Sequence, residues 1–190
     1  MTNGVFSDYE VREMGIKFNA STTNTYKTAN CVGSSEEEME AKVITKSCRG
    51  AVAKKIVKGT GNGTLSLSLH IPWEIYVEAY GMELDTLVEG VKAYGQNSRH
   101  KDFSLTQHVY DEDGVEKYVA YPNCIIESGK TSKIENGAEE VAEVELEISV
   151  QPDEFGNGVY TALATELQDE TIKTKWMTAF EPSMVQVASA

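Results

Sequence analysis

The three histidines are the side chains best suited to acid–base or metal chemistry. His70, His100 and His108 are far apart, and no His-x-x-x-His or His-x-x-Glu-His spacing of the kind found in zinc sites is present. No Gly-x-Ser-x-Gly sequence marks a hydrolase nucleophile. His70 and His108 fall on the polar faces of predicted strands, which indicates side chains that are exposed or lie at an interface. We therefore predict that the chain is not an enzyme, with no catalytic residue, no cofactor and no metal.

The cysteines indicate neither a disulfide framework nor a metal site. Cys31, Cys48 and Cys124 are odd in number and widely spaced, and they include no Cys-x-x-Cys pair. Buried free thiols are the expected state. The segment that begins at Met1 lacks the basic and apolar regions of a signal peptide, and no long apolar stretch follows, so we expect a protein that is neither secreted nor membrane-spanning.

The charge balance excludes further classes. The 190 residues include 30 Asp and Glu against 17 Lys and Arg, for a formal charge of −13, while 41% of residues are apolar. That apolar content is typical of a folded chain, and the length suits a single domain over residues 1–190. The acidic excess argues against binding to DNA phosphates and against attraction to an anionic membrane.

Alternation of apolar and polar residues is the dominant pattern, and it predicts β-strands with one face toward a core. The clearest runs are Met39–Lys46, Leu65–Ile71, Phe103–Tyr110 and Val144–Val150. Because each run has one polar face, an antiparallel sheet is expected. Weaker candidate strands are Val11–Phe18, Ala51–Lys58, Val91–Tyr94, Glu116–Tyr121, Val159–Ala162 and Thr171–Met177.

Turn residues separate these strands. Gly59–Gly63 predicts a hairpin turn, because it leads into a strand and lacks the lysine of a phosphate loop. Asp111–Gly114 and Asp153–Gly158 predict two more turns. Only Pro72–Gly81 has helical periodicity, with Trp73, Tyr76, Val77 and Tyr80 on one face. The predicted fold is therefore mainly β with one principal α-helix, a β-sandwich or partly open barrel.

Two segments and one strand face could meet other molecules. Residues 21–38 are polar and irregular, which predicts an extended loop used in assembly, and residues 181–190 predict a C-terminal arm. Glu143, Glu145 and Glu147 line one side of a predicted strand, with Glu139 and Glu140 just before it. This row is either an ordinary solvated face that guards a sheet edge or a surface that repels a passing polyanion.

The order of these features resembles a known family. Gly63-Thr-Leu-Ser-Leu-Ser-Leu-His-Ile-Pro-Trp-Glu-Ile-Tyr leads into the short helix, followed by Glu89–Gly95, Tyr121–Cys124, the acidic strand from Ile134 to Leu146, and Lys173–Phe180. Together these segments, over roughly residues 35–182, resemble the major tail protein (tail tube protein) of phages with long non-contractile tails that infect Gram-positive hosts. The order and spacing of the segments carry the resemblance, because none of the short motifs is specific alone.

The resemblance implies a structural virion protein with the tail-tube type of β-sandwich or barrel. Such subunits close into rings, usually of six, that stack into the hollow tail tube around a tape-measure protein, between a tail terminator and distal tail proteins. DNA passes through the lumen without specific binding. The protein would be made in the host cytoplasm and would not bind membranes. Candidate lumen-facing residues are Glu139, Glu143, Glu145 and Glu147, and candidate inter-ring contacts are Ser34, Ser35, Glu36, Glu37 and Glu38.

Three alternatives stay open at this point. The first is another virion role, such as a capsid decoration or head–tail joining protein, and the second is the inner tube of a contractile tail. The third is a β-barrel that binds a small ligand, or an enzyme built on one, which would need an apolar cavity with a few convergent polar groups.

Overall fold

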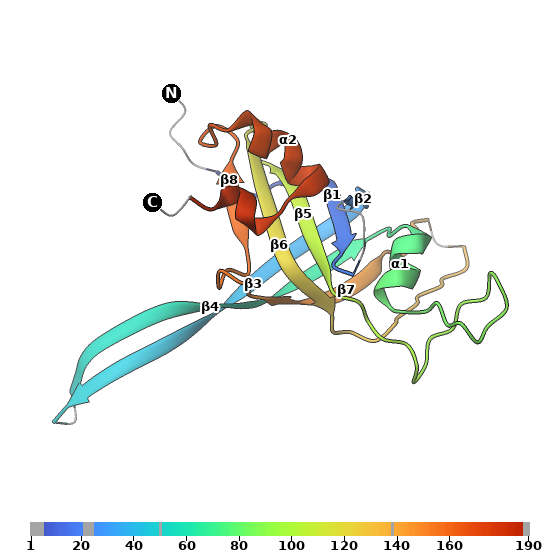
Figure 1. Cartoon of the computed structure of the whole chain (residues 1–190), viewed down its shortest axis with the longest axis horizontal. Coiled ribbons are helices and arrows are strands. Elements are labelled where there is room, and N and C mark those ends of the chain that lie inside the picture. Colours follow the sequence, from blue (N-terminus) through green and yellow to red (C-terminus); the bar gives the residue numbers. More distant parts are fainter. Residues whose placement is uncertain (1–5, 21–24, 50, 138, 188–190) are drawn as a thin grey trace.

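The molecule is mainly β, and its strands form one antiparallel sheet with two α-helices packed against it (Figure 1). The structure is a computed structural model that describes residues 6–20, 25–49, 51–137 and 139–187. The strand order is β2-β1-β5-β6-β7-β4-β3, and β8 pairs with β6. The elements are β1 (Glu10–Phe18), β2 (Lys27–Thr28), β3 (Val32–Cys48), β4 (Ala51–Leu69), α1 (Trp73–Ala79), β5 (Phe103–Tyr110), β6 (Glu116–Ile126), β7 (Val144–Gln151), β8 (Tyr160–Leu163), α2 (Glu170–Ala179) and the 3-10 turn η1 (Pro182–Val185).

The sheet curls until strands from its two ends contact each other. β1 lies near one end of the strand order and β3 at the other, yet the two are in contact. Ser35 of β3 also hydrogen-bonds to Gln107 of β5, with 3.0 Å between Gln107 Nε2 and Ser35 Oγ. Curling lets apolar side chains of both ends meet in one core, as burial of a single sheet face requires. Its members include Met14, Ile16, Leu65, Leu67, Leu105, Leu146, Ile148 and Val150.

Helix α1 closes one end of this core, as the sequence predicts. Tyr76, Val77 and Tyr80 are buried, and Gly81 ends the helix with φ of 59°. A Cβ at Gly81 would lie 2.0 Å from the carbonyl oxygen of Arg99, so only glycine fits there. Trp73 was expected on the buried face but is 62% exposed, because it begins the helix at the surface.

The prediction of one principal helix needs correction, because a second and longer helix, α2, is present. Thr171–Met177 was expected to be a strand, yet it lies in α2, whose N-cap Asp169 accepts hydrogen bonds from the backbone N–H groups of Thr171 and Ile172. Trp176 of α2 is buried and donates to the Val119 carbonyl at 3.2 Å. Helix α2 thereby covers the second face of β5 and β6 with a smaller apolar cluster of Tyr26, Tyr118, Ala120, Trp176 and Phe180.

Burial on both faces of β5 corrects the prediction of an exposed His108. Ser104, Thr106 and His108 were expected on a solvated face, and all three are buried. His108 packs on the Tyr118 ring at 4.5 Å between centroids, and its Nε2 lies 3.0 Å from Glu116 Oε2. Ser104 donates to the Pro122 carbonyl at 2.7 Å. Ser104 and His108 are thus hydrogen-bonded inside the fold, whereas the buried Thr106 hydroxyl has no hydrogen-bond partner among the described residues.

Strands β3 and β4 continue past the sheet as a long two-stranded ribbon (Figure 1). Only Gly63–Leu69 of β4 pairs with β7, so residues 41–59 project from the body with the ribbon's two strands paired only to each other. We call this projection, Ala41–Gly59, the arm. At about 3.3 Å per residue, the eight residues Ala41–Cys48 extend roughly 26 Å.

The prediction of a hairpin turn at Gly59–Gly63 is wrong, because this segment lies within β4. The chain reverses between Cys48 and Ala51, and Gly59–Gly63 lies inside β4 as a bulge opposite Glu40. A Cβ at Gly61, where φ is 81°, would come within 2.8 Å of the Gly156 carbonyl oxygen. Gly61 therefore serves close packing against the Asp153–Gly158 turn, rather than a chain reversal. The turns at Asp111–Gly114 and Asp153–Gly158 are confirmed.

Regular structure forms in both the predicted extended loop, residues 21–38, and the predicted C-terminal arm, residues 181–190. Of residues 21–38, Val32–Glu38 belong to β3 and Lys27–Thr28 form β2, while 21–24 lie outside the described residues. Of residues 181–190, Pro182–Val185 form η1, and Val185 packs against the Trp176 cluster. Residues 188–190 lie outside the described part. No strand forms in the described segment Val91–Tyr94.

The prediction of buried thiols holds for one cysteine only. All three are free, and Cys124 is buried whereas Cys31 and Cys48 are exposed. Desolvation raises the pKa of the Cys124 thiol well above its usual range. Among the described helices, none is both long enough and apolar enough to cross a bilayer.

Candidate functional site

The outward side of β3, β4 and β7 forms an acidic surface. In antiparallel strands, directly opposed residues point to the same face of the sheet. Ser66 of β4 is opposed by Glu36 on one side and by Glu147 on the other. The adjacent rows follow the same register. We call this surface the acidic face, and it consists of Ser34, Glu36, Glu38, Thr64, Ser66, Ser68, Glu145, Glu147 and Ser149.

The register brings together residues that the sequence placed in two separate groups. Glu145 and Glu147 were predicted to face a lumen, whereas Glu36 and Glu38 were predicted inter-ring contacts. All four side chains are exposed on the acidic face. Sequence alone could not join them, because Glu36 and Glu147 are 111 positions apart and meet only through β4.

The remaining candidates lie elsewhere. Ser35 and Glu37 occupy the opposite face of β3, across from Leu67 and Leu65. Ser35 hydrogen-bonds to Gln107 there, and Glu37 lies near the buried Tyr121 phenol, whose pKa is raised first by burial and further by that carboxylate. These two residues were predicted as inter-ring contacts. They lie on the core side of β3, yet both are exposed, and their role in ring contacts stays a prediction.

Glu143 and Glu139 precede β7 rather than belonging to it. The Glu143 carboxylate accepts a hydrogen bond from Ser68 Oγ at 2.6 Å, which fixes it at the margin of the acidic face. A Cβ at Gly33 would lie 2.2 Å from Glu143 Oε1, so glycine lets the carboxylate approach β3. Glu139 is exposed in the loop before the strand. Of the lumen candidates, Glu145 and Glu147 alone lie within β7 itself.

Electrostatics of the acidic face come from carboxylates without paired cations. Within the described residues, no ion pair includes Glu36, Glu38, Glu145 or Glu147. Ser and Thr hydroxyls separate the glutamates, and the side chains are exposed, so the carboxylates stay solvated. A surface of this kind repels phosphate groups and offers them no basic side chain.

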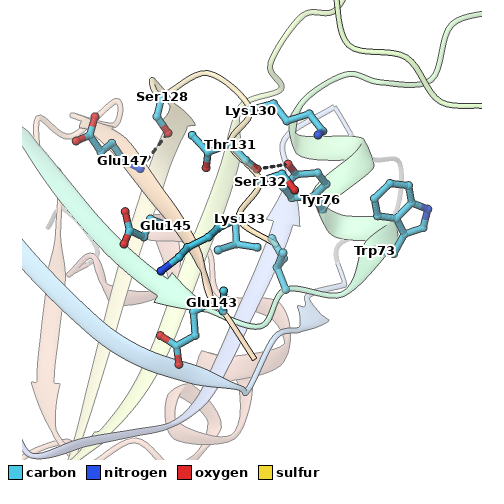
Figure 2. Close-up of a pocket in the computed structure, with 13 residues that line it drawn as sticks. Trp73, Tyr76, Ser128, Lys130, Thr131, Ser132, Lys133, Glu143, Glu145 and Glu147 are labelled. Carbon is cyan, nitrogen blue, oxygen red and sulfur yellow. Dashed lines mark hydrogen bonds between the residues drawn. The ribbon is translucent and has the colours of Figure 1, made fainter. Parts of the chain in front are cut away.

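A groove lies beside the acidic face (Figure 2). It holds about 580 Å³ between α1, the loop at Ser128–Lys133 and the start of β7. Tyr76 donates to the Thr131 carbonyl at 3.2 Å, and Ser128 Oγ accepts from the Glu147 N–H at 3.2 Å. Figure 2 shows Trp73 directed away from these residues. The polar groups of the groove thus hold the loop against the helix and strand, rather than converging on one reacting atom.

Chemistry-bearing groups do not gather elsewhere in the described structure. His108 faces Glu116, Tyr110 and Tyr118, and the His100 Nδ1 lies 2.7 Å from the Ile126 carbonyl oxygen. Within the described ranges, no three His, Cys, Asp or Glu side chains lie close enough to hold a metal ion.

Sequence reasoning missed the arm, although a signal for it exists. From Lys42 to Lys58 the chain has six Lys and Arg residues and no Asp or Glu, in a protein of formal charge −13. The same stretch contains large apolar side chains that are 36–65% exposed. Its charge run and its two alternating segments joined by Ser-Cys-Arg-Gly could have indicated a projecting basic hairpin. The exposed apolar residues are Val43, Ile44, Val52, Ile56 and Val57.

Comparison with models of known protein families and with curated proteins finds no match for this chain.

Proposed function

We propose that this chain is the subunit of a phage tail tube, a structural virion protein whose rings stack into a conduit for DNA. The acidic face is the observation that carries the proposal. A conduit for DNA needs a wall without clustered basic side chains, because phosphate contacts would hold the polymer in place. The acidic face offers such a wall on three adjacent strands, as an even surface of short hydroxyl and carboxylate side chains.

Open strand edges also support assembly. β3 lies at the end of the strand order, and in the arm both β3 and β4 lack a further partner strand. An edge of this length is a template for pairing with another chain unless it is covered. Neighbouring subunits that join edge to edge in a closed ring would satisfy these groups, and the acidic face would then continue around the inside of the ring.

The proposed partners follow from this assignment. They are other copies of the chain, a tape-measure protein inside the tube, and terminator and distal tail proteins at its ends, with DNA in transit. The inner tube of a contractile tail would use the same surfaces. A capsid decoration or head–tail joining protein would not polymerise, and a ligand-binding barrel would need an open interior, where this fold has packed side chains such as Leu65, Leu105 and Ile148.

Electron microscopy of the purified chain tests the proposal. We expect concentrated protein to form rings with a central hole or hollow tubes over days, with light scattering as a parallel measure. If it does not, the tails of isolated phage particles should contain this chain. Absence of the chain from tailed particles, together with monomers in solution, would contradict the proposal and favour the decoration role.

Charge reversal on the acidic face tests its place in the lumen. Glu145→Lys with Glu147→Lys should slow DNA ejection from intact particles by about tenfold, because every ring would then hold phosphates, and added salt should reduce the effect. Both side chains are exposed, so the fold should persist. Glu154→Lys with Glu166→Lys makes the same charge change outside the acidic face and serves as the control. Equal ejection rates for the two variants would argue against a lumenal acidic face.

A further inference from the structure

One face of the arm carries lysines opposed to lysines. Lys42 is directly across from Lys58, and Lys46 is across from Lys54, with Ile44 and Ile56 between them. Like charges in directly opposed positions destabilise a β-ribbon. Among the ion pairs of the described residues, none involves these four lysines. This lysine face therefore gains stability when an acidic surface lies against it.

The arm is also unusually apolar for a free projection. Val43 and Val57 oppose each other on its second face and are 51% and 59% exposed, and Val52 near the tip is 65% exposed. Two-stranded ribbons alone are marginally stable in water. Exposed apolar side chains along such a ribbon indicate a surface that is covered in the assembled state.

A surface of opposite character lies at the far end of the same molecule. The loop before β7 carries Glu135, Glu139 and Glu140 together with Ile134 and Val141, which are 86% and 82% exposed. We call these five residues the acidic loop. One weak exposed ion pair, Lys133 with Glu135 at 3.9 Å, occurs there. In Figure 1 the arm extends from one side of the body and this loop lies beside α1 on the other side, so the arm points away from the loop of its own chain.

We propose that the arm of one copy docks on the acidic loop of a second copy, with Lys42, Lys46, Lys54 and Lys58 facing its glutamates. Each chain then donates at one end and accepts at the other, which is a head-to-tail contact that repeats without limit. The arm is basic and the acidic loop is negatively charged, and both carry exposed apolar side chains, so the two surfaces are complementary. The acidic face of β3, β4 and β7 stays uncovered. This inference rests on the proposed self-assembly and specifies which surfaces meet.

Two complementary charge-swapped chains test the contact. The first has Lys46→Glu with Lys54→Glu in the arm, and the second has Glu139→Lys with Glu140→Lys in the loop. Either variant alone places like charges against each other, so we expect at least about a tenfold rise in the protein concentration needed for assembly. Mixed in equal amounts, the two chains should assemble again, because each arm then finds a loop of opposite charge.

Sedimentation velocity at low salt provides the readout, with electron microscopy of the same samples. Glu154→Lys with Glu166→Lys, which makes the same charge change as the loop variant at exposed positions outside the arm and the acidic loop, should behave as wild type. Circular dichroism confirms that each variant is folded. Association of wild type and of the mixture should weaken as salt rises.

Three outcomes would overturn the contact. Either swapped chain could assemble as readily as wild type, or the mixture could fail to recover, and in both cases wild-type tubes would leave the proposed function intact. Wild-type chains that stay monomeric in low salt at the highest soluble concentration would also exclude it. Conversely, salt-sensitive association that is lost in each variant and restored in the mixture, but that never yields tubes, would support the contact and contradict the tube.

Discussion

A chain whose arm is cut back, with residues 43–57 replaced by an Asn-Gly turn between Lys42 and Lys58, is expected to fold and to form no tubes. Lys42 and Lys58 are directly opposed, so a two-residue turn can join them. The described side chains that would be removed are exposed, and the change should shift Tm by less than about 4 °C. Assembly should be lost because the arm supplies exposed apolar side chains, cations and open strand edges at one end of the subunit.

Thermal unfolding and electron microscopy of the same preparation would separate the two effects. A useful comparison is deletion of Ser34–Glu38, which an irregular assembly loop would tolerate. Here these residues pair with Thr64–Ser68 in the body of the sheet, so the deletion should unfold the chain rather than disable its assembly. Normal tubes from the shortened arm would show that the arm is dispensable and would return attention to the sheet edges.

Short-range pattern was enough to predict the elements whose environment is simple. Leu65, Leu67 and Leu69 alternate with polar residues and are buried in β4. Leu146 and Ile148 likewise alternate with polar residues and are buried in β7. The helix at Trp73–Ala79 was predicted from its apolar spacing and from the glycine that ends it. In these places the residue pattern and the tertiary surroundings agree, because one face meets the core and the other meets solvent.

Prediction failed where tertiary packing decided between two local possibilities. Gly59–Gly63 has the composition of a turn, yet it lies inside β4, where Gly61 lets a strand bulge pack against Asp153–Gly158. Thr171–Met177 alternates weakly like a strand, but Asp169 caps a helix there and Trp176 needs the second face of β6. The Asp169 N-cap before Glu170 was a readable signal for that helix.

The candidate site, too, could be predicted from the sequence only in part. A row of glutamates at residues 143, 145 and 147 could be found from sequence, since alternation fixes its place on one side of a strand. Its union with Glu36 and Glu38 depends on β4 lying between β3 and β7, and such long-range register follows from the whole sheet. The basic arm could have been predicted from its charge run, but only the structure shows that it lies far from the acidic loop.

Strand β7 allows a buried and an exposed position to be compared directly, because its alternate residues face the core and the solvent. Leu146 lies opposite Leu67 and is 2% exposed, so Leu146→Ala should lower the free energy of unfolding by about 2–5 kcal/mol through lost burial and a residual cavity. Glu147→Gln, one position along and exposed, should change that free energy by no more than about 0.5 kcal/mol. Urea unfolding of the isolated chains measures both values. A Leu146 variant as stable as wild type would show that β7 does not pack as described. If the Leu146 variant is destabilised and the Glu147 variant is not, surface changes on β7 leave the sheet intact. A change in assembly or ejection caused by substituting Glu145 and Glu147 can then be attributed to the charge of the acidic face.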